Sequence, residues 1–178
     1  MSEFIPKDYK SPVSNSGYMK LQQGENLIRI LSTAIMGWVD WKDNKPHRFK
    51  MNNKPKTSFD PKKPVRHFWA FIVWDYADKA IKIMEITQST IQGELQNLSQ
   101  DEDWGNPSQY DVKITRKGES LETEYSVIAK PKKDLTEEIK TAYDEKKINL
   151  SALFSGNDPF KVADKSVGEE DEDKIPAF

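Results

Sequence analysis

Aromatic and basic side chains are interleaved in the first half of the chain. Such a mixture could bind a ligand that has both negative charges and aromatic rings. Cationic groups attract phosphates and aromatic faces stack on unpaired bases, so together they suit a single-stranded nucleic acid. Residues 42–67 hold nine basic side chains against two acidic ones, a net charge of +7. Charge of that density favours a polyanionic partner. The candidate DNA-binding residues are Arg29, Trp38, Trp41, Lys42, Lys45, Arg48, Phe49, Lys50, Lys54, Lys56, Lys62, Lys63, Arg66, His67, Trp69, Phe71 and Lys82.

The rings of the strand predicted at 66–76 divide between two faces, because successive side chains of a strand point to opposite sides. Phe68 and Trp74 share one face with Ile72 and are assigned to the core. On the other face, which carries Trp69, base stacking and core packing both remain open. Trp69 is the first candidate for a base-stacking platform, and Trp41 is the second.

Groups suited to catalysis or metal binding are sparse. The chain has no cysteine, and its two histidines both lie in the basic segment. Asp75, Asp78 and Glu85 resemble the carboxylates of a metal-dependent nuclease, but they flank a tight hairpin, where acidic residues commonly solvate the rim. No phosphate-cradling glycine motif is present. We therefore expect a binding protein that is not an enzyme and needs no cofactor or metal.

The last fifteen residues form a second group with a distinct character. Residues 164–178 hold six acidic and two basic side chains, a net charge of −4, and end in an apolar tip. Such a tip can fill a partner's pocket while the terminal carboxylate pairs with a basic residue. The alternative is a tail that only solubilises. We expect a disordered tail that recruits a replication or repair protein through Asp171, Glu172, Asp173, Ile175, Pro176 and Phe178.

Hydrophobic patterning predicts a mainly β domain. A β-rich run at 25–41 indicates one long strand with a bend or bulge at Gly37, followed by a long irregular basic loop at 42–65. The order of elements is that of the OB-fold, a five-stranded barrel whose helix lies between strands three and four. We thus expect an irregular arm (1–18), an OB-fold single-stranded DNA-binding domain (19–163) and a disordered acidic tail (164–178). The remaining predicted elements are strands at 66–76 and 80–87, a helix at 88–99 capped by Thr87, a hairpin with strands starting at 110 and 122, a helix at 135–143 and a packed strap at 148–160.

Nothing in the sequence predicts a membrane segment or export. No apolar run approaches the ~18 residues that a transmembrane helix needs. The first residues lack the basic-then-apolar order of a signal peptide. With the absence of cysteine, these features favour the cytoplasm, which would be that of the host if a phage encodes the protein.

Several short segments carry a resemblance to a known family: Phe68-Trp69-Ala70-Phe71, Val73-Trp74-Asp75-Tyr76, Glu85-Ile86-Thr87-Gln88, Asp103-Trp104-Gly105, Tyr110-Asp111-Val112 and Thr115-Arg116-Lys117-Gly118. On these segments, residues of about 20–135 resemble a family of bacteriophage single-stranded DNA-binding proteins, which implies an OB-fold and roles in phage DNA replication, recombination and repair. The tip resembles that of bacterial single-stranded DNA-binding proteins, which end in an aspartate run and Ile-Pro-Phe. Here Lys174 interrupts the acids and Ala177 separates Pro176 from Phe178.

The expected function is sequence-independent coating and protection of single-stranded DNA. One alternative is an interaction protein that imitates DNA to occupy a host enzyme, although the +7 segment disfavours it because a mimic needs an acidic working face. Another is an RNA-binding protein or a chaperone for single-stranded nucleic acids, since stacking on bases does not distinguish the sugars.

Overall fold

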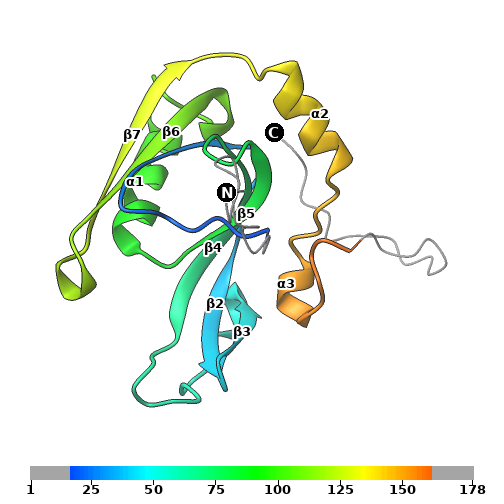
Figure 1. Cartoon of the computed structure of the whole chain (residues 1–178). Helices are drawn as coiled ribbons and strands as arrows, with labels where there is room; N and C mark the ends of the chain where they lie inside the picture. Colours follow the sequence, from blue (N-terminus) through cyan, green and yellow to red (C-terminus); the bar gives the residue numbers. More distant parts are fainter. Residues whose placement is uncertain (1–16, 162–178) are drawn as a thin grey trace, which may run out of the picture.

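Seven strands form one antiparallel open sheet in the computed structural model, which describes residues 17–161. They follow the order β3-β2-β4-β1-β6-β7, and β5 pairs with the other edge of β4 (Figure 1). This mainly β arrangement is consistent with an OB-like fold, although it has more strands than the five predicted. The strands are β1 (Gly24–Ile30), β2 (Ile35–Lys42), β3 (Lys45–Lys50), β4 (Arg66–Asp75), β5 (Ala80–Ile86), β6 (Tyr110–Lys117) and β7 (Glu124–Lys132).

Short helices complete the described part of the chain. The predicted acidic tail lies outside the described residues. So does the predicted arm, except for Gly17 and Tyr18, which pair with Ile83 of β5. None of the helices between residues 17 and 161 has the length and apolar character that crossing a membrane requires. The α-helices are α1 (Ser89–Gln100), α2 (Glu137–Glu145) and α3 (Ala152–Ser155), and the 3-10 helices are Met51–Asn53, Pro107–Gln109 and Ser120–Glu122.

The predicted first strand is in fact two strands that pair with successive parts of β4. Residues 28–30 of β1 pair with 73–75, and residues 35–39 of β2 pair with 66–70. Between them, the N–H of Leu31 donates to the carbonyl of Ile72, and the N–H of Ile72 donates to the Ser32 hydroxyl at 2.9 Å. A serine side chain that takes the place of a backbone carbonyl interrupts the regular ladder at this point.

The basic loop predicted at 42–65 begins with a β-hairpin that the sequence reading missed. Asp43 and Asn44 both have positive φ (52° and 61°) and form the two-residue turn between β2 and β3. Two successive left-handed residues give the hairpin turn that matches strand twist, and Asp and Asn tolerate this conformation. Gly37 is not a bulge: a Cβ there would lie 2.2 Å from the Phe49 carbonyl oxygen, so close approach of β3 requires the glycine.

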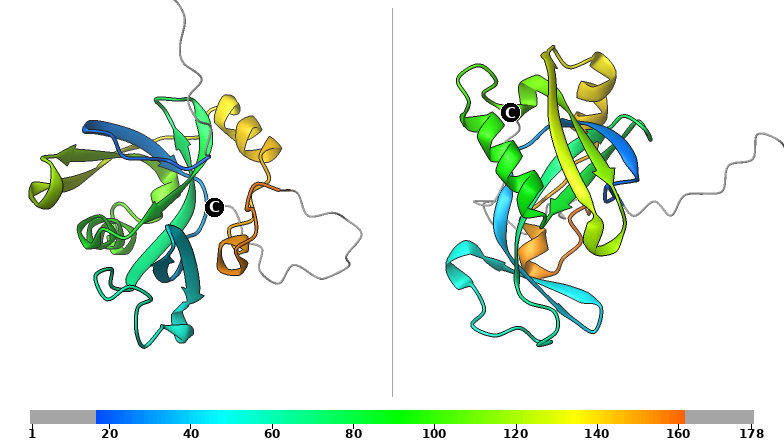
Figure 2. Two further views of the ribbon diagram at one scale, coloured as in Figure 1. Left: turned by 60° about the horizontal axis from the view of Figure 1, so that its bottom comes forward. Right: turned by 90° about the vertical axis from the view of Figure 1, so that its left-hand side faces the viewer.

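Both faces of β4 are buried, which explains its nearly unbroken apolar sequence. Phe71 and Val73 pack into a core covered by α1, on what we term the α1 face. Phe68 and Trp74 pack on the opposite face, the strap face, where the chain from 135 to 160 and its helices α2 and α3 cover the sheet (Figure 2). The prediction that Phe68, Ile72 and Trp74 belong to the core is therefore confirmed.

The helices are close to their predicted positions. Helix α1 is capped by Gln88 rather than Thr87, with no side-chain cap bond, and α2 begins two residues later than expected, after the cap Thr136. Helix α1 also lies beside β7, where Glu94 accepts a hydrogen bond from the Val127 N–H at 2.7 Å. No pairing of β5 with β7 occurs within residues 17–161, and β7 contacts α1.

Candidate nucleic-acid interface

Four rings form a row on the α1 face of the three-stranded wing made by β2, β3 and the first half of β4. Trp38 of β2 lies opposite Phe49 of β3 and opposite His67 of β4. Residues directly opposite each other in antiparallel strands share a face, and Trp69 follows His67 on the same face of β4. We call Phe49, Trp38, His67 and Trp69 the aromatic row.

Hydrogen bonds fix the orientation of three of these rings. The Trp69 indole N–H donates to His67 Nε2 at 3.1 Å, so the other ring nitrogen, Nδ1, carries the proton and donates to the Gly37 carbonyl at 2.8 Å. The Trp38 indole N–H donates to the Met51 carbonyl at 3.1 Å, and its ring centroid lies 5.1 Å from that of His67. Because the polar edges are occupied within the protein, the flat faces are the parts left to contact a ligand.

Exposed cations lie on the wing that carries the aromatic row and on its loop. Two of them are on the strap face: Lys50 is opposite Gly37 and Arg66 is opposite Val39. The Lys54 ammonium lies 4.3 Å from the centroid of the Trp38 ring, a cation–π contact. None of the exposed cations of the wing and its loop forms an ion pair with another residue of the 17–161 segment. They are thus free to neutralise phosphates. These predicted residues are Lys42, Lys45, Lys50, Lys54, Lys56, Lys62, Lys63 and Arg66.

Asp40 ties the loop that carries the lysines to the wing. Its buried carboxylate accepts hydrogen bonds from the backbone N–H groups of Trp41 and Phe59, both at 2.9 Å. The Phe59 ring then rests against His47 with centroids 5.3 Å apart. Trp41 itself is 40% exposed. It is an odd number of residues from Trp38 in the same strand and so lies on the strap face, away from the aromatic row.

Two predicted DNA-binding cations are held in ion pairs instead. Arg48 pairs with Glu85 at 2.5 Å, and Lys82 pairs with both Asp75 and Asp78. Burial opposes the charge of Lys82, but the hydrogen bonds to the two carboxylates outweigh it and raise the pKa of its ammonium group. The same pairs account for the three acidic residues weighed as metal ligands, and no cluster suited to a metal ion occurs among the residues described.

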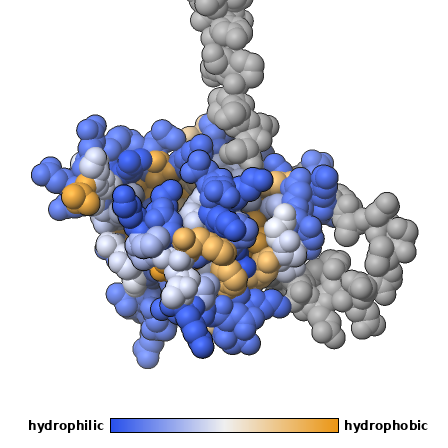
Figure 3. Space-filling view, turned by 90° about the horizontal axis from the view of Figure 1, so that it is seen from below, coloured by the Kyte–Doolittle hydropathy of each residue, from blue (hydrophilic) through white to orange (hydrophobic). Residues whose placement is uncertain are grey.

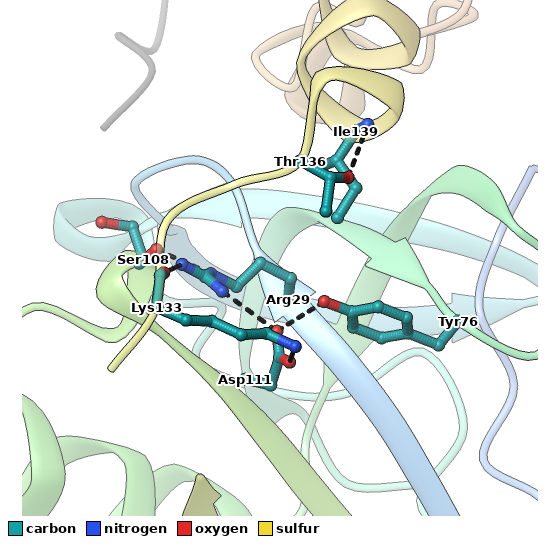
Figure 4. A network of polar contacts seen from close by, with 7 residues as sticks. All are labelled: Arg29, Tyr76, Ser108, Asp111, Lys133, Thr136 and Ile139. Atoms are coloured by element: carbon teal, nitrogen blue, oxygen red, sulfur yellow. Dashed lines mark hydrogen bonds and ion pairs between the residues drawn. The ribbon is translucent and has the colours of Figure 1, made fainter. Parts of the chain in front are cut away.

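Arg29 is buried and holds three segments together, so the structure assigns it a structural position (Figure 4). Its guanidinium donates to the Ser108 carbonyl at 2.8 Å, to Asp111 at 3.1 Å and to the Lys133 carbonyl. Asp111 also accepts from the Tyr76 hydroxyl at 2.7 Å. Burial opposes the charge of Asp111, but hydrogen bonds from Lys133, Tyr76 and Arg29 outweigh it and lower the pKa of its carboxyl. The Arg29 side chain is 2% exposed and borders a pocket that Lys132, Lys133 and Lys140 also line.

A cleft of about 740 Å³ lies between α1 and one end of the aromatic row, where His67 and Trp69 line it. Sequence reasoning missed several of its residues, although Met36, which is 42% exposed, alternates with Trp38 and could have been placed on this face. Phe71, predicted to contact DNA, lies at the floor of the cleft and is only 2% exposed. The view onto the wing from below shows apolar side chains surrounded by hydrophilic ones (Figure 3).

Comparison with known proteins finds one distant relative. The chain is 25% identical over 139 residues to a protein of Escherichia phage T5 described as a "Probable ssDNA-binding protein". The match covers 62% of this chain and 53% of the phage T5 protein, so the chain spans about half the length of its relative. No family model matches the sequence, and a search of solved structures finds no match.

The aromatic row leads to a prediction that separates the two faces of the wing. We expect Trp69→Ala to weaken binding of single-stranded DNA by ~1–3 kcal/mol, because one stacking surface is lost. Trp41→Ala serves as the control: it removes an exposed ring of the same type from the opposite face and should change affinity much less. Filter binding measures the affinity for DNA and thermal unfolding measures stability, so the two assays distinguish a lost DNA contact from lost core packing. A Trp69 variant that melts earlier yet binds with full affinity would restrict this ring to the core.

Proposed function

We propose that the protein binds single-stranded DNA without marked sequence preference, as a non-enzymatic coating protein with an OB-type barrel. The observation that carries the proposal is the aromatic row on a wing that, together with its loop, carries eight exposed cations, none of which has an acidic partner among the described residues. Stacking surfaces and unpaired positive charge are the two components that sequence-tolerant single-strand binding requires. The distant similarity to a probable ssDNA-binding protein of a phage supports the same function.

Titration of tryptophan fluorescence tests this function directly. Two of the five tryptophans lie in the aromatic row, so stacking of bases should quench part of the emission. We expect saturable quenching by single-stranded DNA, weaker binding of duplex DNA, and a salt-dependent affinity. Equal affinity for single-stranded RNA would broaden the function to single-stranded nucleic acids in general. Absence of quenching and of binding by every single strand would reject the proposal.

We further propose that the acidic tail links DNA coverage to the recruitment of replication, recombination or repair proteins in the cytoplasm of a phage-infected cell. The acidic run of residues 164–178 is complementary in charge to the basic loop, and its tip ends in Phe178. A tethered tail competes with DNA at high effective concentration, although each exposed charge contact is weak. Bound DNA would therefore free the tail for a partner.

Two truncations separate these roles of the tail. Deletion of residues 164–178 should tighten DNA binding, most clearly at low salt, where charge interactions are least screened. Deletion of Phe178 alone should leave DNA affinity nearly unchanged but abolish capture of a replication or repair protein. If the longer truncation binds DNA no better at any salt concentration, competition by the tail is absent. If the shorter one retains every partner, the tip does not recruit.

A further inference from the structure

We propose that the cleft between α1 and the aromatic row holds one unstacked nucleobase, which stacks on Trp69 and is recognised at its edge by the carboxamides of Gln96 and Gln100. This inference rests on the proposed binding of single-stranded DNA and adds a position at which the protein distinguishes bases. The remainder of the strand would be held by its phosphates and by stacking, without regard to sequence.

The cleft has the size and shape for one nucleotide unit. Its volume of about 740 Å³ lies within the ~300–1,000 Å³ of small-molecule sites. One wall is the sheet, with Met36 and Trp69, and the facing wall is the last two turns of α1, with Gln96 and Gln100. The cleft thus offers an indole for stacking on the sheet and two amide groups for hydrogen bonding on the helix.

The lining of the cleft suits a neutral ring better than a phosphate. Its floor is apolar and includes Ile30, Phe71 and Leu95. Neither an acidic side chain nor a lysine or arginine lines it, whereas eight exposed cations lie on the wing and its loop. A nucleotide would therefore place its base inside and its phosphate outside, towards the cations. The charge distribution thus specifies the orientation of the ligand.

Three glutamines at intervals of four residues lie along one side of α1, and they differ in what they contact. The Gln92 amide is used within the protein, because it donates to the carbonyls of His67 and Ile86 at 3.2 and 3.1 Å. Gln96 and Gln100, one and two turns further on, are exposed, and their carboxamides have no hydrogen-bond partner among residues 17–161. The first glutamine anchors the helix to the sheet, and the other two present free donors and acceptors to the cleft.

A carboxamide matches the edge of a base because it offers a donor and an acceptor side by side. Glutamine and asparagine pair in this way with base edges in duplexes, and unstacked bases of single strands are read on the same edges. Stacking alone does not distinguish bases. Any base preference that the protein shows should therefore depend on Gln96 and Gln100 rather than on the rings.

Occupancy of the cleft can be measured by chemical protection. The chain has no cysteine, so Gln96→Cys and Asn97→Cys each introduce a unique thiol. Both positions are exposed and adjacent in α1, but only residue 96 lines the cleft. We expect saturating oligo(dT) to slow iodoacetamide alkylation at position 96 and to leave position 97 unchanged. Equal reactivity at position 96 with and without bound DNA would overturn the proposal.

Edge recognition is tested by comparing oligo(dA), oligo(dC) and oligo(dT). We expect the wild-type protein to distinguish at least two of them by about fivefold or more, the lower end of the effect of one base-edge contact. The double variant Gln96→Leu, Gln100→Leu should bind all three with similar affinity, while Asn97→Leu should retain the wild-type preference. A preference that survives the double variant rejects edge recognition. Failure of the wild-type protein to bind any of the three would reject the proposed function instead.

Discussion

Replacement of Lys54, Lys56, Lys62 and Lys63 by alanine should weaken binding of single-stranded DNA by up to about several hundred-fold at 0.1 M salt. Each phosphate that a cation neutralises contributes about 0.7 to the slope of log K against log salt for single strands. If about five phosphates are neutralised, the slope should rise from roughly −3.5 in the wild-type protein to roughly −0.7 in the variant. The structure supports this expectation because all four ammonium groups are exposed and form no ion pair with described residues.

The control for this experiment removes the same number of positive charges from another part of the surface. Lys79, Lys117, Lys130 and Lys147 are equally exposed but lie outside the wing and its loop. Alanine at these four positions should leave the slope near the wild-type value. If both quadruple variants lose the same slope, net charge rather than the basic loop determines affinity, and an unchanged slope in the loop variant would locate the phosphate contacts elsewhere.

Asp111→Asn should lower the free energy of unfolding by ~3–5 kcal/mol, the cost of removing one member of a buried ion pair. The change leaves the guanidinium of Arg29, which is 1% exposed, without its counter-ion. The pKa of Asp111 is lowered in the folded protein. Its contribution to stability is therefore complete above its unfolded pKa of about 3.9 and is lost as the pH falls through the lower folded pKa. Urea unfolding at neutral pH measures the full effect.

An exposed ion pair provides the comparison. Glu25→Gln removes the partner of Lys113, a pair with an N···O distance of 3.2 Å in which the Glu25 side chain is 69% exposed. We expect a change of less than ~1 kcal/mol, as for other surface pairs. The Asp111 variant, assayed under conditions where it is folded, should bind DNA with nearly wild-type affinity. A large loss of affinity in that folded variant would return Arg29 to the DNA-binding residues.

Sequence patterns predicted the single strands and helices because short stretches of sequence determine these elements. The strand at 80–86 places Ile81 and Ile83 in the core of the strap face and Met84 and Ile86 in the core of the α1 face. The spacing of Ile91, Leu95 and Leu98 follows from a helix with one buried side. The division of the first strand depends on a hydrogen bond from Ile72 to Ser32, 40 residues away. No local pattern contains that contact.

The hairpin of β2 and β3 escaped notice for a related reason. Pro46 and the dense lysines favour a loop when they are read one residue at a time, yet proline is compatible with an edge strand. The Asp43-Asn44 pair was the available signal for a hairpin turn.

Charge was the part of the candidate site that sequence could indicate, because exposure is the ordinary state of a lysine. Burial of Arg29 could not be read in the same way. Its carboxylate partner, Asp111, is 82 residues away along the chain and meets it only after β1 has paired with β6. The cleft depends likewise on how α1 is placed over the sheet, so the contributions of Gln96 and Gln100 become visible only in three dimensions.

Strand β3 is an edge strand of the sheet, and its composition affects how neighbouring copies of the protein interact. An unpaired edge is a template on which a second chain can add its own strand and begin aggregation. In β3, Pro46 removes one backbone donor, and Lys45 and Lys50 place like charges at the two ends. Copies of the protein bound side by side on one DNA strand would meet at high local concentration. This edge would then keep neighbouring molecules from joining sheet to sheet, so that close spacing leaves them as separate, reversible units.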